Sequence, residues 1–146
     1  MLSKSCEYAL RAIVYISCNA SVEHKLGFKE VAEKLDIPSA YMGKILQKLT
    51  KNGVIKGVKG PNGGFYLRES CKETKLIRVV EVIDGLDYFT KCGLGLHECS
   101  ETRPCPVHNE LKVFRDGVAA VFAKKSINDM VQSIQAGEAF IQNVAP

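Results

Sequence analysis

The first half of the chain contains three segments in which apolar residues recur at the three- and four-residue spacing of an amphipathic α-helix. These segments cover residues 3–19, 28–35 and 39–52. Gly27 is a suitable N-cap for the second segment, Pro38 is well placed to open the third, and Gly53 to end it. The pattern predicts a short helix, a tight turn and a second amphipathic helix, which is the order of a helix-turn-helix.

A β-branched run over residues 54–59 follows, and a second apolar run covers residues 65–67. The segment between them is Gly60-Pro61-Asn62-Gly63-Gly64, and the Asn-Gly pair in it is a strong signal for a hairpin turn. We therefore predict a two-stranded wing directly after the helix-turn-helix.

The second half of the chain predicts a helix over residues 76–84, an irregular stretch over 86–103, and a long helix from Pro106 to about Lys124. A last short helix begins at a sequence typical of a capping box, residues 126–129. The long helix has apolar residues at the 3-4-3 spacing of a coiled-coil seam, which indicates dimerisation: Leu111, Phe114, Val118 and Val121.

The predicted fold class is mainly α, a winged helix-turn-helix with a two-stranded wing and a long C-terminal dimerisation helix. We expect a DNA-binding domain over residues 1–85, a loop over 86–105 that holds a metal cluster, and the dimerisation helix with the C-terminal helix over 106–146.

The distribution of charge along the chain indicates what the predicted helix-turn-helix binds. The 146 residues carry a net charge of +4, and residues 38–68 contain six basic residues and no acidic one, so the rest of the chain has a net charge of −2. A basic window of this kind is typical of a surface that binds double-stranded DNA, although a solvated lysine-rich face would show it too. The predicted major-groove contacts are Ser39, Ala40, Tyr41, Lys44 and Lys48, and the predicted wing contacts to backbone or minor groove are Lys59, Gly60, Pro61, Asn62 and Gly63.

Composition excludes several other classes of protein. No apolar run approaches the ~20 residues that span a bilayer, and we find no signal-peptide pattern, so we expect a cytoplasmic protein without a membrane partner. In that compartment the six cysteines would be thiols or metal ligands. No catalytic motif for an enzyme is evident.

Three cysteines are concentrated in a single loop rich in glycine and proline, and a histidine follows them in the first turn of the long helix. They follow the pattern Cys-x6-Cys-x5-Cys-x2-His: Cys92, Cys99, Cys105 and His108. Thiolate and neutral imidazole are the ligands that soft and borderline metals prefer, so this loop is a candidate metal site.

Taken together, these motifs resemble those of the IscR/NsrR-type (Rrf-two) family of bacterial transcription regulators. The resemblance rests on the loop and on five further segments: Glu7-Tyr8-Ala9-Leu10-Arg11, Ile45-Leu46-Gln47-Lys48-Leu49, Gly60-Pro61-Asn62-Gly63-Gly64-Phe65, Val82-Ile83-Asp84-Gly85 and Ser126-Ile127-Asn128-Asp129-Met130. It implies a homodimer that binds a palindromic operator and senses iron–sulfur status, nitric oxide or redox state. Two features depart from the family pattern: the first cysteine gap is six residues rather than the frequent five, and Lys59 stands where many members have arginine.

The identity of the metal stays open between four alternatives. Three cysteines and His108 suffice for a 2Fe-2S cluster, and the Cys-x2-His ending is similar to that of the IscR branch. The resemblance to the NsrR-like branch implies instead a 4Fe-4S cluster that is completed by a carboxylate near the N-terminus of the partner subunit, and Glu7 occupies that position; Cys6 and His97 are further candidates. A zinc site is possible but its cysteines usually lie closer together, and the loop could also hold no metal. In those last two cases the chain would be a DNA-binding or protein-interaction module without cluster sensing.

If a cluster is present, we expect its assembly or loss to reshape a loop that lies against the dimerisation helix and the DNA-binding unit.

Overall fold

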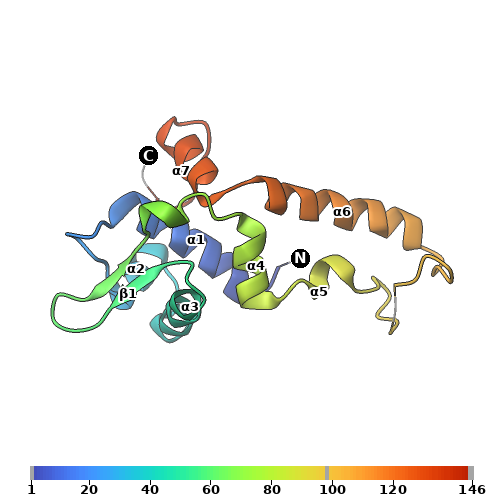
Figure 1. Ribbon diagram of the computed structural model, residues 1–146, viewed down its shortest axis with the longest axis horizontal. Helices are drawn as coiled ribbons and strands as arrows, with labels where there is room; N and C mark the ends of the chain where they lie inside the picture. The colour runs from blue at the N-terminus through green and yellow to red at the C-terminus, as the bar shows by residue number, and fades with distance from the viewer. Residues whose placement is uncertain (1, 98, 145–146) are drawn as a thin grey trace.

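The computed structural model describes residues 2–97 and 99–144. It is mainly helical with one two-stranded antiparallel sheet, which confirms the predicted fold class (Figure 1). In chain order the elements are α1 (Lys4–Asn19), α2 (Phe28–Leu35), α3 (Ser39–Lys51), β1 (Lys56–Val58), β2 (Gly64–Tyr66), the 3-10 turn η1 (Glu69–Cys71), α4 (Leu76–Asp84), α5 (Asp87–Thr90), α6 (His108–Lys124) and α7 (Ile127–Gln135). Within the described residues, no helix combines the length and the apolar character needed to cross a membrane.

Helix α1 forms the centre of the core, because its apolar residues cover more than one face. Ala9, Ala12, Ile13 and Ile16 are almost completely buried, and α1 contacts α2, α3, α4 and α7. Burial of one large aliphatic side chain stabilises a fold by roughly 1.5–3 kcal/mol, so this helix contributes strongly to the stability of the core.

The helix-turn-helix has the boundaries that the capping residues predict. Helix α2 begins after Gly27 and α3 after Pro38. The side chain of Arg11 donates to the carbonyl oxygen of Leu35 over 2.8 Å, which satisfies one of the carbonyl groups left free at the end of α2. Beyond α3, Gly53 has a positive φ of 74°, which glycine adopts without strain.

The wing is shorter than the apolar runs suggest. Val54 and Ile55, which we expected in the first strand, are instead buried in the core next to the end of α3. In the tip, the Gly63 N–H donates to the Gly60 carbonyl over 2.9 Å, so Pro61 and Asn62 occupy the centre of the turn. Asn62 contributes to the turn, but the Asn-Gly pair is not its centre.

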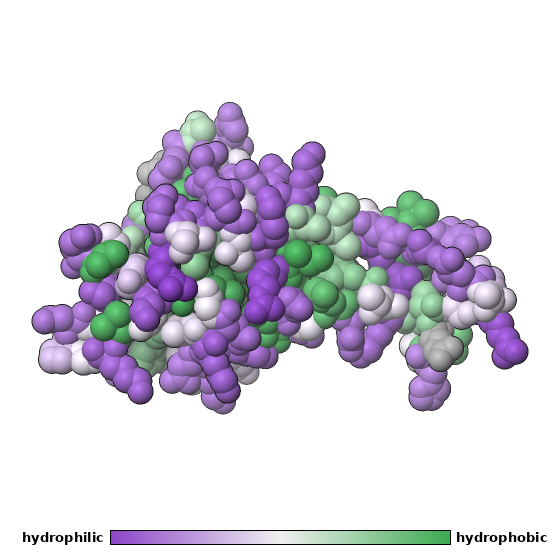
Figure 2. Space-filling model, in the orientation of Figure 1, coloured by the Kyte–Doolittle hydropathy of each residue, from purple (hydrophilic) through white to green (hydrophobic). Residues whose placement is uncertain are grey.

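Helices α5 and α6 and the loop between them form an arm that extends away from the wing, and α4 connects this arm to α1 and α3 (Figure 1). Helix α5 lies in the stretch that we predicted to be irregular, so that prediction was wrong for residues 87–90. Apolar side chains gather where α4, α5 and α6 meet (Figure 2). Val80 and Phe89 are buried there, and Val118 and Phe122 of α6 pack against them. This small apolar cluster, which also includes Cys6 of α1, holds the arm to the rest of the chain.

The predicted coiled-coil seam lies at the border between this packed side of α6 and its outer side. Leu111 and Val118 are half-buried, whereas Phe114 and Val121 are 59% and 57% exposed and Val113 is 74% exposed. One face of α6 is therefore apolar and uncovered in the single chain.

Helix α7 returns to the body and packs against α1, so the C-terminal segment completes the N-terminal core. It begins with the predicted capping box: the Asp129 N–H donates to the Ser126 hydroxyl over 3.0 Å, and the Ser126 N–H donates to the Asp129 carboxylate over 2.7 Å.

Candidate metal centre and nucleic-acid interface

The loop between α5 and α6 places its four candidate ligands at the start of α6. Cys92 lies two residues after Thr90, the last residue of α5, and is 7% exposed. His108 is the first residue of α6 and is 5% exposed. Its backbone N–H donates to the Cys105 carbonyl oxygen over 3.0 Å. Cys99 is half-buried between them. The beginning of α6 thus forms one side of this candidate site.

The structure brings the four candidates together in two pairs. The sulfur atoms of Cys92 and Cys105 lie 3.9 Å apart, and the sulfur of Cys99 lies 3.3 Å from Nδ1 of His108. Among residues 2–97 and 99–144, no three His, Cys, Asp or Glu side chains converge closely enough to hold a single ion. The ligands are gathered, but not in one four-coordinate geometry.

The local backbone favours the anionic form of one of these cysteines. The N–H groups of Leu94 and Leu96 lower the pKa of the Cys92 thiol, with smaller contributions from the Cys105 thiol and the Arg115 guanidinium. Because a thiolate is the form that binds metal, this environment suits Cys92 to ligation.

Arg115 is a part of the site that sequence reasoning missed. It lies seven residues after His108, so it projects from the same side of α6. Its guanidinium donates to the Cys99 sulfur over 3.1 Å and also to the carbonyl oxygen of Lys91. The spacing from His108 is the signal that could have identified it.

The alternative ligands belong to neither of the two pairs. Glu7 is on α1 and forms an exposed ion pair with Lys4 over 2.9 Å. Cys6 is fully buried, and burial raises the pKa of its thiol to about 12, which opposes ligation. His97 is exposed on the loop.

The predicted DNA-contacting residues form an exposed surface at the start of α3 and the tip of the wing. Ser39, Ala40, Tyr41 and Lys44 are all exposed, and the ring of Tyr41 makes an edge contact with that of Tyr8. In the wing, residues 59–62 are exposed and Gly63 is half-buried. These two regions project on the same side of α1 (Figure 1).

Lys48 differs from the other predicted contacts. Its ammonium group donates to the carbonyl oxygen of Ile83, in the last turn of α4, over 3.0 Å. It therefore ties α3 to α4 in the free chain, while its side chain remains exposed.

A groove of about 320 Å³ lies between α3 and the wing, lined by Gln47, Thr50, Lys51, Gly57, Val58, Lys59 and Phe65. Gln47 adds an amide to this surface, which we did not single out in the sequence. The Thr50 hydroxyl is buried and has no hydrogen-bond partner within the described residues.

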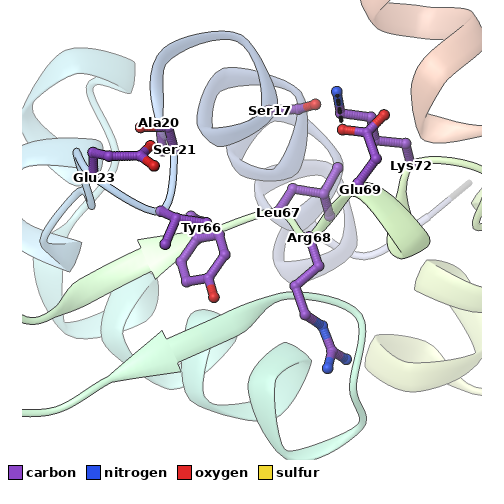
Figure 3. A pocket seen from close by; sticks show the side chains of 10 residues that line it. Ser17, Ala20, Ser21, Glu23, Tyr66, Leu67, Arg68, Glu69 and Lys72 are labelled. Atoms are coloured by element: carbon purple, nitrogen blue, oxygen red, sulfur yellow. Dashed lines mark ion pairs between the residues drawn. The ribbon is translucent and has the colours of Figure 1, made fainter.

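A second open cavity of about 320 Å³ lies between the end of α1 and β2 (Figure 3). Glu69 and Lys72 form an ion pair at its edge over 2.8 Å, and Figure 3 shows the Arg68 side chain extending away from that pair. No candidate ligand or DNA-contacting residue of the sequence analysis lines it.

A helix-turn-helix followed by a two-stranded wing places the chain in the winged-helix class of proteins, with the long helix α6 as an addition. The sequence matches the Rrf2 family, described as iron-dependent transcriptional regulators, over residues 2–133. The chain therefore belongs to the Rrf2 (Rrf-two) family of transcription regulators.

Known relatives support this assignment. The chain is 29% identical over 133 residues to a protein of Aquifex aeolicus that is provisionally named an HTH-type transcriptional regulator, covering 90% of this chain and 91% of that protein. It is 24% identical to the HTH-type transcriptional regulator IscR of Photorhabdus laumondii, covering 90% and 79%. These relatives are named as regulators rather than as enzymes.

Solved structures share the fold. CymR, the global cysteine regulator of B. subtilis, superimposes with a TM-score of 0.72 at 17% identity, covering 90% of this chain and 96% of that one. The IscR of T. potens superimposes with a TM-score of 0.71 at 16% identity, covering 97% and 93%.

Proposed function

We propose that this chain is a homodimeric, operator-binding regulator that carries an iron–sulfur cluster in the loop between α5 and α6 and uses it to sense iron–sulfur, nitric oxide or redox state. The observation that carries the proposal is the pairing of Cys92 with Cys105 and of Cys99 with His108 at the start of α6. The family's description as iron-dependent supports the choice of iron.

The donor set fits a 2Fe-2S cluster better than the alternatives. Each iron of such a cluster takes two protein ligands, and the four side chains lie as two pairs. Zinc would need one tetrahedral group of four. Cys92, Cys99, Cys105 and His108 would hold the cluster, which would supply one-electron redox chemistry. The chain itself contributes burial of Cys92 and His108, N–H groups directed at Cys92, and the cation of Arg115.

Metal analysis of protein purified without oxygen tests this assignment. We expect a brown protein with about two irons and two sulfides per chain, and loss of both in Cys99→Ser. Cys18→Ala is the matched control, because Cys18 is a half-buried thiol of α1 outside the loop and should leave the metal content unchanged.

The other outcomes distinguish the alternatives. About four irons per chain would indicate a 4Fe-4S cluster and make Glu7 the candidate fourth ligand. A colourless protein with one zinc, or with no metal, would contradict cluster sensing and leave a DNA-binding or protein-interaction module.

For DNA, we propose that α3 enters the major groove with Ser39, Ala40, Tyr41 and Lys44, and that residues 59–63 of the wing contact the backbone or the minor groove. The exposure of these residues and the basic character of residues 38–68 support this placement. Lys48 would contact DNA only if its ammonium group gave up the hydrogen bond to the Ile83 carbonyl oxygen.

Salt dependence of binding to a selected palindromic duplex tests the interface. Each phosphate contact contributes about 0.9 to the slope of log K against log salt concentration, and each contact occurs twice in a dimer. Lys44→Gln should therefore reduce the slope by about 1.8, and Lys48→Gln by less. Lys125→Gln, at the junction of α6 and α7, is the control. An unchanged slope in Lys44→Gln would contradict the placement of α3.

A further inference from the structure

Arg115 connects three parts of the candidate metal site. Its guanidinium donates to the carbonyl oxygen of Lys91, at the point where the loop leaves α5, and to the sulfur of Cys99 over 3.1 Å. The side chain itself projects from α6, two helical turns after His108. One side chain thus joins the beginning and the middle of the loop to the helix that carries His108.

Arg115 differs from the neighbouring Lys112 in its charged partners. In the described part of the chain no carboxylate lies within ion-pair distance of it, whereas the neighbouring Lys112 pairs with Asp116 over 2.9 Å and with Glu101 over 3.7 Å. The Nε atom of Arg115 is buried and has no hydrogen-bond partner among those residues. The guanidinium charge therefore faces the sulfur of Cys99.

We propose that Arg115 is a positioning residue that clamps the loop against α6 at Lys91 and Cys99 and, through its hydrogen bond to the Cys99 sulfur, raises the reduction potential of the site. The second part rests on the cluster proposed above. Hydrogen bonds and positive charge at ligand sulfurs stabilise the more electron-rich, reduced form of a cluster. The two-point contact uses the planar fork of arginine, which lysine cannot reproduce.

The experiment compares Arg115→Met, Arg115→Lys and the control Lys112→Met, which removes a neighbouring cation that already pairs with carboxylates. In the metal-free proteins, amide hydrogen exchange over residues 92–97 and at Cys99 should be at least tenfold faster in both Arg115 variants and unchanged in the control. In the loaded proteins, Arg115→Met should lower the one-electron reduction potential by at least the 59 mV that corresponds to a tenfold change in the redox equilibrium. Arg115→Lys, which retains the charge, should lower it less.

Each result decides a separate point. Wild-type exchange rates in both Arg115 variants would overturn the clamp, and a wild-type potential in Arg115→Met would overturn the effect on the cluster. If the wild-type protein takes up no cluster, the proposed function fails, but the exchange comparison still tests the clamp. If Arg115→Met does not fold, the exchange rate of Arg115→Lys decides, and a wild-type rate in that variant would overturn the proposal.

Discussion

The homodimer that we propose predicts a measurable role for the exposed apolar face of α6. Phe114 is 59% exposed in the single chain, and complete burial of such a side chain is worth about 1.5–3 kcal/mol. A two-fold dimer buries two copies, so Phe114→Ala should weaken it by about 2–3.5 kcal/mol. That loss corresponds to a dissociation constant raised roughly 30- to 300-fold, which sedimentation equilibrium measures directly.

The control for this prediction is Asp116→Ala. Asp116 is exposed on the same helix, but it lies on nearly the opposite side from Phe114 and pairs only with Lys112 within the described residues. An exposed ion pair of this kind contributes at most about 1 kcal/mol to stability, so the dimer should be unaffected. If Phe114→Ala and Asp116→Ala have the dissociation constant of the wild type, this face of α6 is not the dimer interface.

Three further predictions concern the body of the chain. Ser126→Ala removes the N-cap of α7 and should lower the free energy of unfolding by about 1 kcal/mol in urea titrations; an unchanged value would contradict the role of the capping box. The backbone N–H and the hydroxyl of Ser126 lower the pKa of Asp129. The Asp129 carboxylate therefore stabilises the fold at pH values above the ordinary aspartate pKa of 3.8, and this contribution is lost as the pH falls below 3.8. The difference in unfolding free energy between wild type and Asp129→Asn should therefore shrink on acidification. In Gly63→Ala the new Cβ would clash with the carbonyl oxygen of Val58, so the wing must rearrange. We expect weaker operator binding by fluorescence anisotropy, with little change in the melting temperature of the protein.

Much of the fold could be predicted because local rules determine it. Amphipathic periodicity located the six longer helices, and capping residues such as Gly27, Pro38 and Ser126 located their starts. Helix α5 escaped prediction, since four residues are too few to show a helical period. The first strand was predicted too long, because β-branched residues such as Val54 and Ile55 suit a buried core as well as a strand.

The site was less accessible to sequence reasoning because its contacts are not local. The order of the cysteines does not reveal that Cys92 approaches Cys105 rather than Cys99. Nor does a basic helix reveal that Lys48 bonds to the Ile83 carbonyl on α4. The first contact depends on how the loop folds back on itself and the second on how α3 packs against α4, and periodicity and composition determine neither.

This packing also determines how the loop could influence DNA binding. The loop lies against α6, as expected, but at the opposite end of the long axis from the wing (Figure 1). Helix α4 contacts both α6 and α3, and its last turn receives the Lys48 ammonium group and the N–H of Ser3, which donates to Asp84 over 2.9 Å.

We infer that a change in the loop acts by shifting α6 relative to α4. The loop and the exposed apolar face occupy different sides of α6, so such a shift need not break the dimer. In a two-fold dimer it would change the distance between the two α3 helices, and a coupling of about 1–3 kcal/mol would already change operator affinity 5- to 150-fold. Helix α4 is thus the element whose position both the loop and the DNA would bias.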